Sequence, residues 1–230
     1  MSEHILPGDP PVTLTLRRSS RARRISLRVS GLDGRVTLTL PRGTPDRQAL
    51  QFAQTKAAWL RAQLDRQSPQ VPVSYGTHLP LEGQSVVVVP TKERRIAWDR
   101  GNLGVPGPED TLPARLEAWL KARARDRLAE ASDRFSASLG KAYSRISLRD
   151  TRSRWGSCTA EGRLMYSWRL VLAPQEVLNY VAAHEVAHLA EMNHSAAFWS
   201  LVARLYPDYD TPRRWLRENG ADLHRYRFRT

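Results

Sequence analysis

The chain has 230 residues, 41% of them hydrophobic, which is enough to bury one large core or two smaller ones and excludes disorder throughout. Its formal net charge of +13 at pH 7 suits a polyanionic partner such as nucleic acid, although nearly all of the basic residues are arginine, a bias that codon composition also produces. The single cysteine, Cys158, excludes an internal disulfide and fits a reducing compartment.

The first half of the chain is predicted to be a β-rich module with one helix, over residues 12–108, after a disordered tail at residues 1–11. Apolar residues at helical spacing between Thr44 and Gln67 predict the helix. Runs that alternate apolar and polar residues predict short antiparallel strands, broken by a turn at residues 31–34. The antiparallel strands are expected at residues 12–16, 24–29 and 36–40, and further strands at residues 86–89, 94–98 and 103–105.

The second half, residues 109–230, is predicted to be a separate domain, because the glycines and prolines of residues 104–110 favour turns. A long helix is expected from Leu112 to Leu139, with Gly140 ending it. Pro174 is expected to begin another helix. Short strands predicted to pair as a small antiparallel sheet lie at residues 145–148, 164–167 and 169–172. The whole chain is therefore predicted to be of the α+β class.

The helix after Pro174 carries the sequence His184-Glu185-Val186-Ala187-His188. Histidines four residues apart lie on one face of a helix, with Cβ atoms about 5–6 Å apart, so two imidazoles converge on one zinc ion. Glu185 flanks that face, where a carboxylate accepts a proton from a metal-bound water. The opposite side of the helix is apolar, which predicts a buried back and a functional front.

The third ligand is predicted to be His194, six residues after His188, the offset at which metzincin proteases place their third histidine. Three imidazoles and an open fourth position are typical of catalytic Zn²⁺. Glu191 is the alternative third ligand, since it lies one turn after His188 on the same face. Without the metzincin glycine, Asn193 is expected to turn the chain in a left-handed conformation, and Ser195 to cap a helix over residues 196–206.

The protein is expected to be soluble and cytoplasmic, with no membrane partner. The longest apolar stretch, residues 169–192, contains too many polar and charged residues for a bilayer-spanning helix. Residues 1–11 lack the charged and apolar regions of a secretory signal.

Three blocks from Ser153 onward resemble the YgjP-like family of zinc metallohydrolases, zincin-like enzymes related to the SprT and WLM proteases. The blocks are Ser153-Arg154-Trp155-Gly156-Ser157-Cys158, then Trp168-Arg169-Leu170 with Tyr180-Val181, and then residues 184–188 with Asn193-His194-Ser195 and Phe198-Trp199. The resemblance implies that His184, His188 and His194 bind zinc and that Glu185 is the catalytic carboxylate.

Several substrates fit this site. A peptide or protein is preferred, because a three-histidine helix motif with an adjacent glutamate recurs in amide hydrolysis. An extended peptide would add to the strand near residues 164–168. A nucleotide or other small molecule is the alternative, with Arg154 and Arg169 as phosphate contacts. A nucleic-acid-binding module, or a protease recruited to DNA, is the third interpretation, suggested by the basic charge.

The remaining polar and aromatic residues are given structural roles. Cys158 is interpreted as a small buried residue outside the ligand set. Tyr180, Tyr206 and Tyr209 are weighed as donors to an oxyanion, and Asp208 and Asp210 as partners of a ligand histidine or as helix caps. The aromatic residues predicted to be core are Trp155, Trp168, Phe198 and Trp199.

Overall fold

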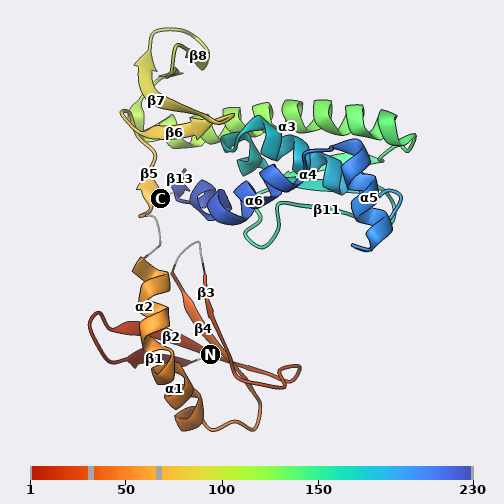
Figure 1. The fold of residues 1–230 in the computed structure, drawn as a ribbon. Helices are drawn as coiled ribbons and strands as arrows, with labels where there is room; N and C mark the ends of the chain where they lie inside the picture. The colour runs from red at the N-terminus through yellow and green to blue at the C-terminus, as the bar shows by residue number, and fades with distance from the viewer. Residues whose placement is uncertain (1, 31–33, 66–68, 229–230) are drawn as a thin grey trace. The chain divides into compact units, whose positions relative to one another are not determined.

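The computed structural model describes residues 2–30, 34–65 and 69–228, and it has the predicted α+β class (Figure 1). The chain divides into two compact units, Met1–Pro69 and Gln70–Thr230. Within the described ranges, no helix is both long enough and apolar enough to cross a membrane.

The first unit is a four-stranded sheet covered on one face by two helices. The strand order is β1-β2-β4-β3. Alternate residues of β2 and β4 are buried, and they pack with Ala49, Ala53 and Leu60 of the helices. The elements are β1 (Ser2–Leu6), β2 (Val12–Ser19), β3 (Ser26–Val29), β4 (Val36–Pro41), α1 (Asp46–Thr55) and α2 (Ala57–Asp65).

This unit differs from the sequence prediction in three ways. Residues 2–6 of the expected tail form β1, which pairs antiparallel with β2. Strands β2 and β4 are neighbours and run parallel. Strand β3 lies at the edge of the sheet, and β4 runs antiparallel to it in the position between β2 and β3. The expected single helix is two helices separated at Lys56, where no glycine or proline signals a break. Residues 31–33 of the expected turn and residues 66–67 of the expected helix lie outside the described residues.

The second unit is built around the long helix α3 (Leu112–Leu139), whose bounds match the prediction and which is about 42 Å long. Gly140 ends it in a left-handed conformation, with φ of 72°. Figure 1 shows α4 (Gln175–Ala187) alongside α3, and the two helices are in contact. The other helices are η1 (Glu109–Thr111), η2 (Trp168–Leu172), α5 (Ala196–Leu205), α6 (Asp210–Asn219) and η3 (Gly220–His224).

Three small sheets complete this unit. One has the order β6-β7-β9-β8, a second β10-β12-β11, and the third pairs β13 with β5. Their strands are β5 (Val71–Pro72), β6 (His78–Leu81), β7 (Gln84–Thr91), β8 (Ala97–Asp99), β9 (Asn102–Pro106), β10 (Arg145–Arg149), β11 (Gly156–Cys158), β12 (Arg163–Ser167) and β13 (Tyr226–Arg227).

The boundary between the units therefore lies near residue 69 and differs from the expected boundary at 108/109. Buried residues of β6, β7 and β9 share one apolar core with α3 and α4, so residues 70–108 fold with the second half. Of the glycines and prolines of residues 104–110, Gly104 and Pro106 belong to β9, and Gly107 and Pro108 lie in the connection from β9 to α3 inside one unit. A turn-rich composition marks a change of direction, and it does not by itself separate two cores.

The sheet β10-β12-β11 also differs from the prediction. Strands β10 and β12 are parallel, and β11 is antiparallel to β12. The expected third strand, residues 169–172, is part of the 3-10 helix η2, and all five residues of η2 are buried. A short, mostly apolar run of this length fits a buried strand or a buried helical turn equally well. The strand that replaces it, β11, is only three residues long.

Arg169 ties η2 to the end of the described chain. Its Nε and Nη2 atoms donate to the two carboxylate oxygens of Asp150, at 2.7 and 3.1 Å. Its Nη1 atom donates to the carbonyl oxygens of Leu223 and Tyr226, at 3.0 and 3.1 Å. The guanidinium also lies over the ring of Trp168, 4.7 Å from its centroid. Buried and fully engaged, Arg169 is not available for the phosphate contact considered from the sequence.

Candidate metal centre

Helix α4 fixes the direction of the two motif histidines. Its Leu178, Ala182 and Val186 are buried, as the apolar pattern predicts. The opposite face carries His184, and His188 follows as the residue that ends the helix. The two rings are in edge-to-face contact, with centroids 5.1 Å apart.

The chain after His188 turns back and brings His194 to the same place. Ser195 caps α5, since its hydroxyl oxygen accepts a hydrogen bond from the Phe198 backbone N–H at 3.4 Å. The Asn193 side-chain oxygen accepts from the Ser195 N–H at 3.0 Å, which makes a local turn. The expected left-handed backbone at Asn193 is wrong: among the described residues other than glycine, only Glu82 and Arg100 have positive φ.

Ring nitrogens of His184, His188 and His194 all lie within 4.8 Å of one another. The Nε2 atoms of His184 and His194 face each other at 3.1 Å. On the other side, the His188 Nδ1 atom donates to the carbonyl oxygen of Glu191 at 2.9 Å, which leaves its Nε2 atom as an acceptor. The rival ligand Glu191 thus contributes its backbone to this arrangement, and its carboxylate is not part of the described cluster.

Aromatic rings surround the three imidazoles. Phe198 stacks on His188 with centroids 4.5 Å apart, and Trp199 stacks on His194 at 5.9 Å. Burial lowers the pKa of His184 to about 3, with contributions from the neighbouring His188 and His194. A neutral imidazole is the form that binds a metal. Burial therefore favours the ligand-competent form of His184, and it lowers the pKa of His188 as well.

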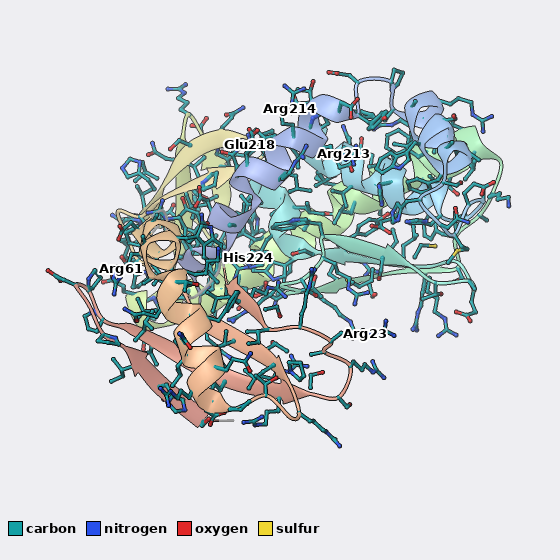
Figure 2. All side chains as sticks on the ribbon, turned by 60° about the horizontal axis from the view of Figure 1, so that its bottom comes forward. Arg23, Arg61, Arg213, Arg214, Glu218 and His224 are labelled. Atoms are coloured by element: carbon teal, nitrogen blue, oxygen red, sulfur yellow. The ribbon has the colours of Figure 1, made fainter. Side chains whose placement is uncertain are left out.

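Trp199 also contacts Arg213, whose guanidinium lies over the ring, 4.2 Å from its centroid. Figure 2 shows Arg213 carried by α6, together with Arg214 and Glu218. Tyr209 stacks on Trp199 as well, at 5.5 Å. Trp199 is thus held in place against His194 and only partly buried, and it is not the interior core residue that the sequence predicted.

Glu185 lies beside the cluster and is only 5% exposed. Burial raises the pKa of its carboxyl to about 8, and the charge of Arg154 opposes that rise. Gly156 of β11 packs against this carboxyl: a Cβ atom at residue 156 would lie 2.5 Å from Glu185 Oε1. The sequence interpretation missed Gly156, although an isolated glycine in a strand is a signal of close approach.

An open cleft of about 460 Å³ joins the histidines, Glu185 and β11. It is lined by Ser153, Arg154, Gly156, Ser157, Cys158, His184, Glu185, His188, Met192 and His194. Cys158 is half-buried in this wall, and it is not one of the ligand atoms of the described cluster. Burial raises the pKa of its thiol to about 11. A neutral thiol agrees with the structural role that the sequence suggested for it.

The strand at the edge of the cleft is β11. The sequence placed peptide pairing near residues 164–168, but β12 is the central strand and has neighbours on both sides. In β11, Trp155 O and Thr159 N bond toward β12, so alternation turns the backbone groups of Gly156 and Cys158 to the open edge. Strand addition within the cleft would therefore occur at β11, the edge strand of this sheet that lines it.

The other residues that the sequence suggested for the site have structural roles. Asp208 accepts a hydrogen bond from the Thr211 hydroxyl at 3.0 Å, and Asp210 pairs with Arg213 at 3.6 Å. Neither contacts a histidine of the cluster through a described interaction. Tyr180 touches His184 edge-on, with centroids 5.9 Å apart, and burial raises the pKa of its hydroxyl to about 12. Tyr180 thus packs against a histidine of the cluster, and it is not among the described residues that line the cleft.

The chain is similar to a family of metallopeptidases and to a solved metallopeptidase structure. No curated protein has a matching sequence. Among solved structures, the metallopeptidase zymogen of Pyrococcus abyssi abylysin is similar, with 20% identity and a TM-score of 0.34 over 41% of this chain and 93% of that one. A family model described as YgjP-like, metallopeptidase domain matches residues 23–219, which confirms the resemblance seen in the three motif blocks. The chain therefore belongs to the YgjP-like metallopeptidase family of metal-dependent hydrolases.

Proposed function

We propose that the protein is a zinc-dependent peptidase in which His184, His188 and His194 hold the metal and Glu185 is the general base. The observation that carries the proposal is the convergence of three imidazole nitrogens within 4.8 Å. Three neutral nitrogen ligands leave the fourth tetrahedral position open, as in catalytic zinc sites. Imidazole also suits other transition metals, but three imidazoles beside a glutamate are typical of zinc hydrolases.

The donor set fits a zinc ion. Two nitrogens about 2.05 Å from a tetrahedral metal lie about 3.3 Å apart, and the Nε2 atoms of His184 and His194 are 3.1 Å apart. Two facing imidazole nitrogens at that distance need a shared proton or a cation between them. The bond from His188 Nδ1 to the Glu191 carbonyl is the kind of support that orients a ligand histidine.

When bound, a zinc ion would lower the pKa of a water towards about 7, favour the ionised form of nearby Glu185 and polarise the scissile carbonyl. Glu185 accepts a proton from the attacking water at a carboxylate oxygen, and it returns that proton to the departing amine as the C–N bond breaks. Contact with Gly156 holds the carboxyl in one place, and its burial keeps bulk water away.

A peptide substrate is supported by the family and by the cleft. The open edge of β11 presents backbone groups of Gly156 and Cys158, which match the hydrogen-bonding pattern of an extended peptide. The nucleotide alternative has less support, because Arg169 is engaged with Asp150 and lies outside the cleft lining.

The test is cleavage of denatured proteins and peptides by the zinc-loaded chain and by Glu185→Gln. We expect the variant to keep its zinc and to lose activity by at least about 100-fold, the usual contribution of a general base. Glu191→Gln is the matched control, since it changes a glutamate outside the ligand cluster, and it should remain active. Full activity of zinc-loaded Glu185→Gln would contradict the proposal. Phosphate release from nucleoside triphosphates without any proteolysis would replace the substrate class and leave the metal site intact.

A further inference from the structure

The cleft beside the three histidines contains one arginine side chain that contributes no described contact to the fold. Arg154 is exposed in the loop between β10 and β11, and it lines the cleft. Its guanidinium makes no hydrogen bond or ion pair with any residue that the structure describes. Other arginines of this unit behave differently: Arg123 and Arg127 pair with Glu82, and Arg169 pairs with Asp150.

The backbone of Arg154 is nevertheless fixed. Its carbonyl oxygen accepts a hydrogen bond from the Thr151 hydroxyl at 2.8 Å, and the Trp155 carbonyl oxygen bonds to the Ser167 N–H at 2.8 Å. The free guanidinium is thus carried on an anchored loop. A long side chain on a fixed backbone loses less freedom when it binds a ligand than one on a loose loop.

Arg154 is also close to the reacting groups. One residue, Trp155, separates it from Gly156, so the two Cα atoms are at most about 7 Å apart. Gly156 in turn contacts the carboxyl of Glu185. An arginine side chain that starts there reaches groups one or two residues away from the bond that Glu185 would help to cleave.

No carboxylate of the described lining is hydrogen-bonded to this guanidinium. Glu185 is the only carboxyl among the lining residues, and it is 5% exposed and packed against Gly156. The remaining polar groups of the lining are uncharged hydroxyls, a thiol and the histidines, and Met192 adds an exposed apolar side chain. The cleft therefore presents to whatever enters it a guanidinium without a described hydrogen-bond partner, and the charge of this guanidinium also acts on nearby Glu185.

We infer that Arg154 is a specificity residue that binds a carboxylate of the substrate one or two residues from the scissile bond. The inference rests on the proposed peptidase function. A guanidinium binds a carboxylate through two parallel hydrogen bonds, which gives both affinity and orientation. The carboxylate belongs either to an aspartate or glutamate side chain or to the C-terminus of the peptide.

The experiment measures binding and cleavage of matched fluorescent peptides by the full zinc-loaded chain. One arm replaces a glutamate at each position by glutamine, and the other replaces a free C-terminus by an amide. Binding is measured with Glu185→Gln, which does not turn the peptide over, and kcat/KM with the wild type. We expect loss of the recognised carboxylate to weaken both by about 10- to 100-fold, the usual range for a charge-assisted pair. The arm that responds identifies the source of the carboxylate.

Arg154→Gln should remove this discrimination and leave zinc content and thermal stability unchanged. Arg154→Lys should restore part of it, and Arg154→Glu should prefer lysine peptides. The control is Arg145→Gln, an exposed arginine of β10 outside the cleft lining, which should keep the wild-type preference. Cleavage with no carboxylate preference, or a preference that persists in Arg154→Gln, would overturn the inference and leave the peptidase proposal standing. Carboxylate-dependent binding that is lost in Arg154→Gln, without any cleavage by the wild type, would support carboxylate recognition by Arg154 and contradict the peptidase proposal.

Discussion

Gly156→Ala should reduce catalysis by displacing the general base while the metal stays bound. A Cβ atom at this position would lie 2.5 Å from Oε1, 2.6 Å from Cγ and 2.7 Å from Cδ of Glu185. Ordinary contacts begin at 3.4 Å, so the carboxyl must move by about 0.9 Å or β11 must shift by a similar amount. A misplacement of about 1 Å at a reacting group costs about 100-fold in rate, and that is the expected loss in kcat.

The assay is steady-state peptide cleavage, with zinc content and melting temperature measured on the same samples. None of the three atoms nearest to the added methyl belongs to a histidine, so zinc content should not change. The backbone at Gly156 is not left-handed, so alanine introduces strain only through this contact, about 1–3 kcal/mol of stability. Gly43→Ala is the control, since its added methyl would meet no atom within 4 Å. Unchanged kcat in a folded, zinc-loaded Gly156→Ala protein would refute the assigned position and role of Glu185.

Three further predictions concern the second unit. Arg169→Leu should lower the free energy of unfolding by about 3 kcal/mol in urea titrations, because it breaks the pair with Asp150 and leaves two carbonyl oxygens without their donor. A loss below about 0.5 kcal/mol would contradict the structural role of Arg169. Burial, reinforced by Arg169, lowers the pKa of His224 from 6.5 to about 4, so between these pH values the unfolded chain holds a proton that the native chain lacks. The free energy of unfolding should therefore rise with pH across this range, by up to about 3 kcal/mol in total. His224→Gln should flatten that rise, and an unaltered slope would show that His224 is not its source. With its pKa raised to about 11, the Cys158 thiol should react with iodoacetamide at pH 8 about 100-fold more slowly in the folded than in the unfolded protein, and equal rates would contradict its burial.

The elements with strong local signals were predictable from the sequence. Leu112 to Leu139 has a helical repeat and a terminal glycine, and α3 has those bounds. The apolar residues of α4 lie on one face of the helix, as helical periodicity predicts, and His184 lies on the opposite face. The position of His194 within the histidine cluster also agrees with its spacing from His188.

The parts that depend on long-range packing were not predictable. Strand order decides that β2 and β4 are parallel, and no local pattern in either strand encodes it. The boundary near residue 69 follows from which apolar faces share a core, whereas the composition of residues 104–110 reports only a turn. The contact between Gly156 and Glu185 joins residues 29 positions apart, so only the folded structure reveals why residue 156 has no side chain.

The most direct test of the metal site is the zinc content of the purified chain and of two variants, His194→Ala and Glu191→Ala. The two substitutions separate the histidine ligand set from the mixed set that the sequence left open. We expect about one zinc ion per chain in the wild type and in Glu191→Ala, and a large loss in His194→Ala, because the ring of His194 and not the carboxylate of Glu191 belongs to the described cluster. Zinc retained in His194→Ala and lost in Glu191→Ala would contradict the three-histidine site.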